Sequence, residues 1–158
     1  MVSKYIHYGS TEFDESKFQP IKNKEISVKP EGGLWGSPLG CRFGWKEWND
    51  SSNYSECSKD NAFIFRLSDD ANVMQIKSVS DLDALPKAES IIPSFSAWVV
   101  LDFEELLRTG VDAIVLNMSE EVPKSATDSL YFKLYGWDCD SILVMNKDVI
   151  LPCPAEEN

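Results

Sequence analysis

The residues best suited to chemistry are two aspartates, Asp138 and Asp140, in the segment 136–141 (GWDCDS). An apolar run at 142–145 follows at once and predicts a buried strand. Side chains two positions apart on an extended segment point to the same side, so we expect both carboxylates at one edge of the core. Burial and a neighbouring like charge can raise a carboxyl pKa into a catalytically useful range. A purely structural turn is the alternative, because Asp and Gly are common where strands begin.

Two earlier segments, 5–9 (YIHYG) and 32–37 (GGLWGS), could supply the rest of a site. A neutral imidazole at His7 could donate a hydrogen bond to a ligand hydroxyl, or it could be an interior histidine paired with a backbone group. Glycines around Trp35 let the backbone approach a ligand closely, the indole offers a flat apolar surface, and Ser37 adds a hydroxyl. A tight turn around a core tryptophan is the alternative. The glycine spacing matches neither phosphate loops nor dinucleotide-binding loops.

Composition and length place the chain among soluble globular proteins. Its 158 residues are 43% hydrophobic and 26% charged, which fits one domain with a real core. We expect that domain to span 1–151 and residues 152–158 to form a flexible tail. No apolar run approaches the roughly 20 residues that cross a bilayer, and the first residues lack the apolar core of a signal peptide. We therefore expect a cytoplasmic protein without a membrane partner.

The net charge of −11 is unevenly distributed. Residues 1–50 carry seven Lys/Arg and seven Asp/Glu, whereas residues 51–158 carry eight and nineteen. An acidic chain binds the nucleic-acid backbone poorly. An anionic ligand would be repelled least near the basic residues of the first third, namely Lys4, Lys17, Lys22, Lys24, Lys29, Arg42 and Lys46.

The four cysteines predict neither a metal site nor a disulfide framework. They have no C-x-x-C spacing, and the chain has one histidine, so we expect no zinc. In a cytoplasmic compartment the thiols should stay reduced. They are Cys41, Cys57, Cys139 and Cys153.

The order of predicted elements indicates an α+β domain with a mainly antiparallel, split sheet and two or three short helices. Short helices are expected from 45, over 80–85 and over 103–108. The segment 68–72 is expected to connect a hairpin. Strands are expected at 4–8, 62–67, 73–76, 111–117, 130–135, 141–145 and 149–151.

Taken together and in this order, the three segments resemble motifs of the ADP-ribosyltransferase superfamily. That family has an aromatic/His or Arg pair on its first strand, which 5–9 resembles, and a second strand that packs on nicotinamide, which 34–37 resembles. It has an acid, often E-x-E, opening a late strand, which 138–144 resembles. The segment 110–115 (GVDAIV) is similar to the element preceding that strand in many members. The segments GGLW and WDCDS are also similar to segments of bacterial and phage proteins, which implies no function.

The resemblance implies an enzyme that transfers ADP-ribose from NAD to a protein or nucleic-acid acceptor. It implies that Asp140 stabilises charge on the ribose and that Asp138 holds or deprotonates the acceptor. The NAD-binding residues that it implies are His7 on a ribose, the Gly9 backbone on the carboxamide, Trp35 and Ser37 at the ring, and Arg42 at the pyrophosphate. Aspartate replaces the usual glutamate, and its carboxylate reaches about one methylene less far.

Two other functions are compatible with the same residues. The first is a non-catalytic module of this fold that binds a nucleotide or a protein, such as a phage-borne inhibitor of a host defence, since acidic surfaces can cover basic proteins. The second is a hydrolase using both aspartates. An inverting glycosidase is disfavoured, because its carboxyls lie about 6.5–9.5 Å apart and two neighbouring acids on one face are closer than that.

Overall fold

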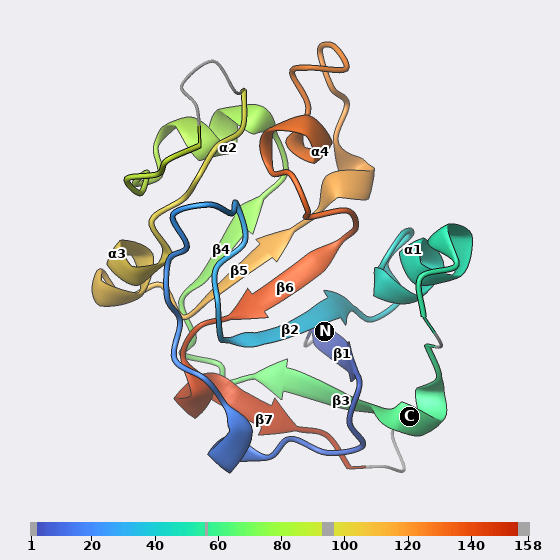
Figure 1. Cartoon of the computed structure of the whole chain (residues 1–158). Helices are drawn as coiled ribbons and strands as arrows, with labels where there is room; N and C mark the ends of the chain where they lie inside the picture. The colour runs from blue at the N-terminus through green and yellow to red at the C-terminus, as the bar shows by residue number, and fades with distance from the viewer. Residues whose placement is uncertain (1–2, 56, 93–96, 155–158) are drawn as a thin grey trace.

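The computed structural model describes residues 3–55, 57–92 and 97–154, and all its strands belong to one seven-stranded sheet of order β4-β5-β6-β2-β1-β3-β7 (Figure 1). Only β4 and β5 run parallel; the other pairs are antiparallel, as expected. The strands are β1 (Lys4–Tyr8), β2 (Leu34–Pro38), β3 (Ala62–Leu67), β4 (Val73–Ile76), β5 (Ala113–Leu116), β6 (Ser141–Val144) and β7 (Ile150–Pro152).

The described residues form four α-helices, rather than two or three, and four 3₁₀ turns. Side-chain caps start several of them; for example, Asp102 accepts a hydrogen bond from the Glu105 N–H at 2.9 Å. None of these helices has the length and apolar character needed to cross a bilayer. The helices are α1 (Trp45–Ser52), α2 (Val79–Asp83), α3 (Phe103–Arg108) and α4 (Leu130–Lys133); the turns are η1 (Glu15–Lys17), η2 (Lys59–Asn61), η3 (Met118–Glu120) and η4 (Lys147–Val149).

Alternation along β5 and β6 builds an apolar core on each face of this half of the sheet. Ile114 and Leu143 point to the face that α2, α3 and α4 cover. Val115 and Ile142 point to the opposite face, where they pack with Phe63 and other residues of the β1-β3-β7 half. The second core therefore contains residues from both halves of the sheet, on either side of β2.

Three expectations about the elements are corrected. Residues 130–133 are helical, not extended, because the Ser129 hydroxyl caps the turn by accepting from the Phe132 N–H at 3.2 Å. The segment 68–72 connects no hairpin, since β4 pairs with β5 at the far side of the sheet from β3. The sheet is not fully split, although β1 and β2 share only two residue pairs.

Residues 152 and 153 belong to the edge of the sheet rather than to the expected tail. Strand β7 includes Pro152, and the Cys153 N–H donates to the Ile64 carbonyl at 2.9 Å. The rest of the predicted tail, from 155 onward, lies outside the described residues.

Candidate functional site

The three segments singled out in the sequence meet at one cavity of about 230 Å³. It lies where β1, β2 and the turn before β6 come together, with α1 closing one side. Among the predicted site residues, His7, Trp35 and Asp138 line it. The full lining consists of Ile6, His7, Tyr8, Lys29, Trp35, Gly36, Trp45, Gly136, Trp137, Asp138, Cys139 and Ser141.

The cavity opens because β1 and β2 stop pairing after Ile6 and Ser37. At the next step of the ladder the Trp35 carbonyl would accept from the β1 backbone. Instead, it lies 2.7 Å from Nδ1 of His7. A carbonyl oxygen can only accept, so Nδ1 carries the proton, and Nε2 of a neutral imidazole is left as an acceptor. This reverses the expected polarity: a neutral His7 can accept from a ligand hydroxyl but cannot donate to it through Nε2.

Glycine is required at position 36, because β2 there lies close against the β1 backbone. A Cβ on Gly36 would lie 2.8 Å from the Ile6 carbonyl oxygen. A side chain there would push β1 away from β2 and displace the wall that both strands form.

Three indoles form the walls of the cavity. Trp35 meets Trp137 edge-on, with ring centroids 4.8 Å apart, and Trp137 stacks on Phe103. Trp45, the first residue of α1, closes the remaining side. Trp137 is 1% exposed, and its indole N–H is the buried side-chain donor that lacks a hydrogen-bond partner within the described part of the chain. Such a donor stays unpaired only at a cost in free energy, which a polar ligand atom would relieve.

Ser37 has a structural role in place of the predicted contact with a ligand. Its side chain is 3% exposed, and its hydroxyl accepts from the Trp45 N–H at 2.8 Å. This bond fixes the first turn of α1 and so holds the Trp45 indole at the cavity. Ser37 lines a neighbouring hollow, not the aromatic cavity.

A cation and a carboxylate share the cavity. The Lys29 ammonium lies over the Trp35 ring, 4.6 Å from its centroid. Burial lowers the pKa of Lys29, and the nearby Asp138 and Cys139 oppose that shift. A Cβ added to Gly136 would lie 3.4 Å from Cδ of Lys29, so the aliphatic part of the lysine side chain runs along this turn.

The thiol in the cavity is not prepared to act as a nucleophile. Burial raises the pKa of Cys139 to about 11, despite a hydrogen bond with Ser141 and the nearby Lys29 that lower it. The thiolate, which is the reactive form, is therefore scarce at neutral pH. Burial also raises the pKa of the Tyr8 phenol. Among the described residues, no cluster of His, Cys, Asp and Glu has the arrangement of a metal site.

Asp140 does not accompany Asp138 in the cavity. Its side chain is 2% exposed and accepts two hydrogen bonds from Ser119: the N–H donates at 2.8 Å, and the hydroxyl donates to the other carboxylate oxygen. Its own N–H donates to the Phe43 carbonyl at 2.9 Å. The chain bends at residues 139–140, and Asp140 stays out of the cavity that Asp138 lines, although both aspartates border one open groove outside it. Asp140 ties η3 and the loop before α1 to the start of β6.

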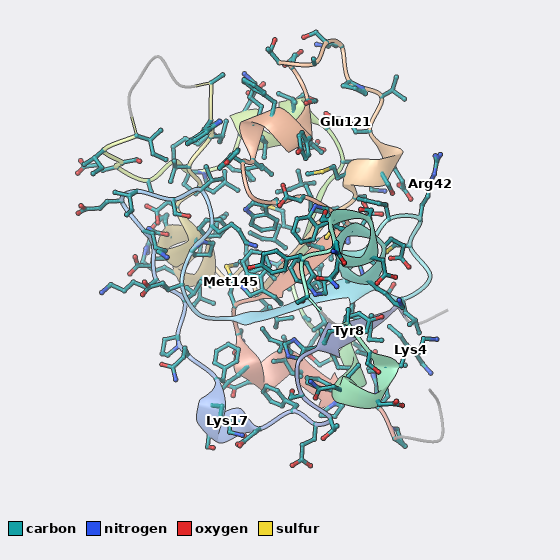
Figure 2. All side chains as sticks on the ribbon, turned by 45° about the vertical axis from the view of Figure 1, so that its right-hand side comes forward. Lys4, Tyr8, Lys17, Arg42, Glu121 and Met145 are labelled. Carbon is teal, nitrogen blue, oxygen red and sulfur yellow. The ribbon has the colours of Figure 1, made fainter. Side chains whose placement is uncertain are left out.

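Two further predicted binding residues, Gly9 and Arg42, do not line the cavity. The Gly9 N–H donates to the Asn61 carbonyl at 2.8 Å, so it has no hydrogen left for a carboxamide. Arg42 is exposed and lines two open grooves on the outer side of Asp140. Figure 2 shows it extending outward from the surface, well away from Tyr8.

Sequence reasoning missed Lys29 and Trp45 as parts of the wall. Lys29 counted only as one of several basic residues in a polar segment, although Val28 and Pro30 on either side are buried. A lysine between two apolar residues is a weak signal that its stem enters the core. Trp45 has a clearer signal, because it follows Gly44 at the predicted start of a helix.

Comparison of the chain with protein-family models, with curated proteins and with solved structures gives no match.

Proposed function

We propose that the protein is an NAD-dependent ADP-ribosyltransferase whose aromatic cavity binds the nicotinamide–ribose half of NAD. The observation that carries this proposal is the convergence of His7, Trp35 and Asp138 on one cavity. They come from the first strand, the second strand and the turn before the late strand, the three places at which the resembling family carries its motifs.

The size and lining of the cavity support this choice of ligand. At about 230 Å³ it is smaller than the roughly 300–1,000 Å³ of typical small-molecule sites, so it suits one ring and a sugar rather than a whole dinucleotide. Indoles favour a planar ring by stacking, and the unpaired N–H of Trp137 could pair with a carboxamide oxygen.

In the proposed reaction, the bond between the nicotinamide nitrogen and C1′ of the ribose breaks, and its electron pair leaves with nicotinamide. The ribose then has oxocarbenium character, which the Asp138 carboxylate stabilises electrostatically. The acceptor nucleophile forms the new bond to C1′ and gives its proton to Asp138 or to water. His7 accepts a hydrogen bond from a ribose hydroxyl through Nε2. Asp138 thus takes the role first expected of Asp140.

Release of nicotinamide from NAD tests this proposal without knowledge of the acceptor, because water can serve as one. We expect the wild-type protein to release nicotinamide and to transfer label from NAD to a protein in cell extract. Asp138→Asn should reduce both by about 10²–10³-fold, the usual effect of removing one electrostatic stabiliser. The matched control is Asp140→Asn, which should keep most activity. A wild-type protein that neither releases nicotinamide nor transfers label would contradict the proposal.

The second candidate, a binding module without turnover, has one specific observation in its favour. Asp140 is committed to Ser119, so one carboxylate rather than two reaches the cavity. For such a module, NAD at a hundred times its Kd should stabilise the fold by ~2.7 kcal/mol, or ~5–11 °C in Tm, while no nicotinamide appears.

A further inference from the structure

Lys29 is a charged residue of the cavity that has no role in the proposed reaction. Its ammonium lies 4.6 Å from the centroid of the Trp35 ring. The face of an indole is the best aromatic surface for a positive charge, because the ring quadrupole is negative there. The same face is the natural place for a planar ligand ring, so lysine and ligand compete for one surface.

The position of the lysine is set by the chain around it. Val28 is 2% exposed and Pro30 is buried, so the backbone on both sides of Lys29 is fixed in the fold. The stem then passes Gly136 before the ammonium reaches the indole. Because that stem is four flexible carbons long, the ammonium can leave while the backbone stays in place.

The surroundings suit a single positive charge. The Asp138 carboxylate lines the same cavity, and Lys29 contributes the cationic side chain of the lining. A second cation a few ångströms from the ammonium would be repelled strongly in a partly desolvated site. Burial lowers the pKa of Lys29, because the charged ammonium is partly removed from water there.

We propose that Lys29 is a built-in competitor whose ammonium occupies the cation position over Trp35 that a planar pyridinium ligand takes on binding. Ligand binding then displaces the ammonium from the ring face, but the fixed backbone around residue 29 keeps its charge near the cavity, where it repels a cationic ring and not a neutral one. Lys29 therefore lowers the preference of the cavity for cationic over neutral rings. The choice of a pyridinium rests on the proposed function, since the nicotinamide ring carries the positive charge in NAD and is neutral in NADH.

The experiment uses two small probes, the N1-methylnicotinamide cation and neutral nicotinamide. Their Kd values are measured by calorimetry at one salt concentration for the wild-type protein and three variants. Lys29→Met removes the charge and keeps the chain length, and Lys29→Ala removes both. Lys22→Met is the matched control, because it makes the same charge change at an exposed lysine of the same segment.

We expect the Lys29 variants to bind the cation more tightly relative to the neutral ring, by roughly 3- to 30-fold, because the repulsion between the displaced ammonium and the cationic ring is removed. Lys22→Met should leave that ratio within about twofold of wild type. The indole N–H resonance of Trp137 should shift with either probe, which places the binding in this cavity. A variant counts as folded if it is recovered at full length and melts cooperatively at the same protein concentration as the wild type.

Two results would overturn the inference. One is weaker cation binding by both Lys29 variants, which would make the ammonium a ligand group rather than a competitor. The other is an unchanged ratio, or no binding of either probe by any folded form. Failure of the proposed function is separable: if the cation ratio changes as expected but NAD releases no nicotinamide, the competitor holds and the transferase does not.

Discussion

Replacing each of the two aspartates separates a structural carboxylate from a functional one. In Asp140→Ala, Ser119 loses the acceptor for its N–H and for its hydroxyl. A hydrogen bond to a charged group contributes ~1.5–3 kcal/mol net. Ser119 is half-buried, so water can replace part of the lost interaction, and the lower end of the range applies. Two such bonds give a loss of ~3 kcal/mol in the free energy of unfolding.

Asp140→Asn should cost less, about 1 kcal/mol. An asparagine oxygen can still accept from the Ser119 N–H, and its amide can donate to a reoriented Ser119 hydroxyl. The backbone bond from residue 140 to the Phe43 carbonyl is unchanged in both variants. By contrast, Asp138→Asn should change stability by less than about 0.5–1 kcal/mol, since this half-buried side chain faces a cavity.

Thermal melts followed by circular dichroism give the first measurement. For a chain of this size, 1 kcal/mol corresponds to ~2–4 °C in Tm, so we expect losses of ~6–12 °C for Asp140→Ala and ~2–4 °C for Asp140→Asn. Binding of NAD or of the small cation gives the second: it should be weaker in Asp138→Asn and unchanged in Asp140→Asn. A folded Asp140→Asn that loses binding, or an Asp138→Asn that melts lower than Asp140→Ala, would refute the division of roles.

Three further outcomes follow from single contacts. Ser37→Ala removes the acceptor for the Trp45 N–H and should cost ~1 kcal/mol, measurable as a lower urea midpoint together with altered tryptophan fluorescence. Gly33→Ala, at φ +70°, places a methyl group 2.6 Å from a side-chain carbon and 2.8 Å from a backbone oxygen, whereas Gly40→Ala, at φ +79°, meets nothing within 4 Å. Urea unfolding should therefore show a loss in the free energy of unfolding above ~3 kcal/mol for Gly33→Ala and of ~1 kcal/mol for Gly40→Ala. Equal losses would contradict this reasoning. Burial lowers the pKa of Lys29 in the folded protein below its ordinary 10.5. Between the folded and unfolded pKa values the unfolded chain binds more protons, so the stability of the wild type should rise with pH relative to that of Lys29→Met. A stability difference between the two proteins that does not change from about pH 8 to 10.5 would show that the lysine is solvated.

Periodicity in the sequence was enough for most strands but not for their pairing. The alternating or continuous apolar runs at 62–67, 73–76 and 141–145 are strands because each has one or two buried faces. The parallel pairing of β4 with β5 depends on contacts between distant segments that no local pattern encodes. Residues 130–135 alternate like a strand, yet Leu130 and Leu134, four positions apart, are both fully buried on one helical face.

Part of the lining of the candidate site could be predicted, because a histidine in a strand, a tryptophan among glycines and an aspartate before a buried strand stand out in the sequence. His7, Trp35 and Asp138 were singled out from separate segments and do line one cavity. That Asp140 stays out of this cavity was not predictable, since it depends on a bend at 139–140 where an extended segment was assumed. The contribution of Lys29 was also hidden, because the burial of a flexible side chain is decided by the groups that fold over it.

The central place of β6 has a consequence for how the chain acquires its fold during synthesis. Leu34 pairs with Val144, 110 positions later, and β6 also completes the pairing of β5. Strand β2 therefore emerges from the ribosome long before its partner exists, and its backbone must wait for nearly all of the intervening chain. Pairings of such long sequence separation form slowly, so we expect refolding to be limited by the docking of β6 and the nascent chain to depend on chaperones that shield β2.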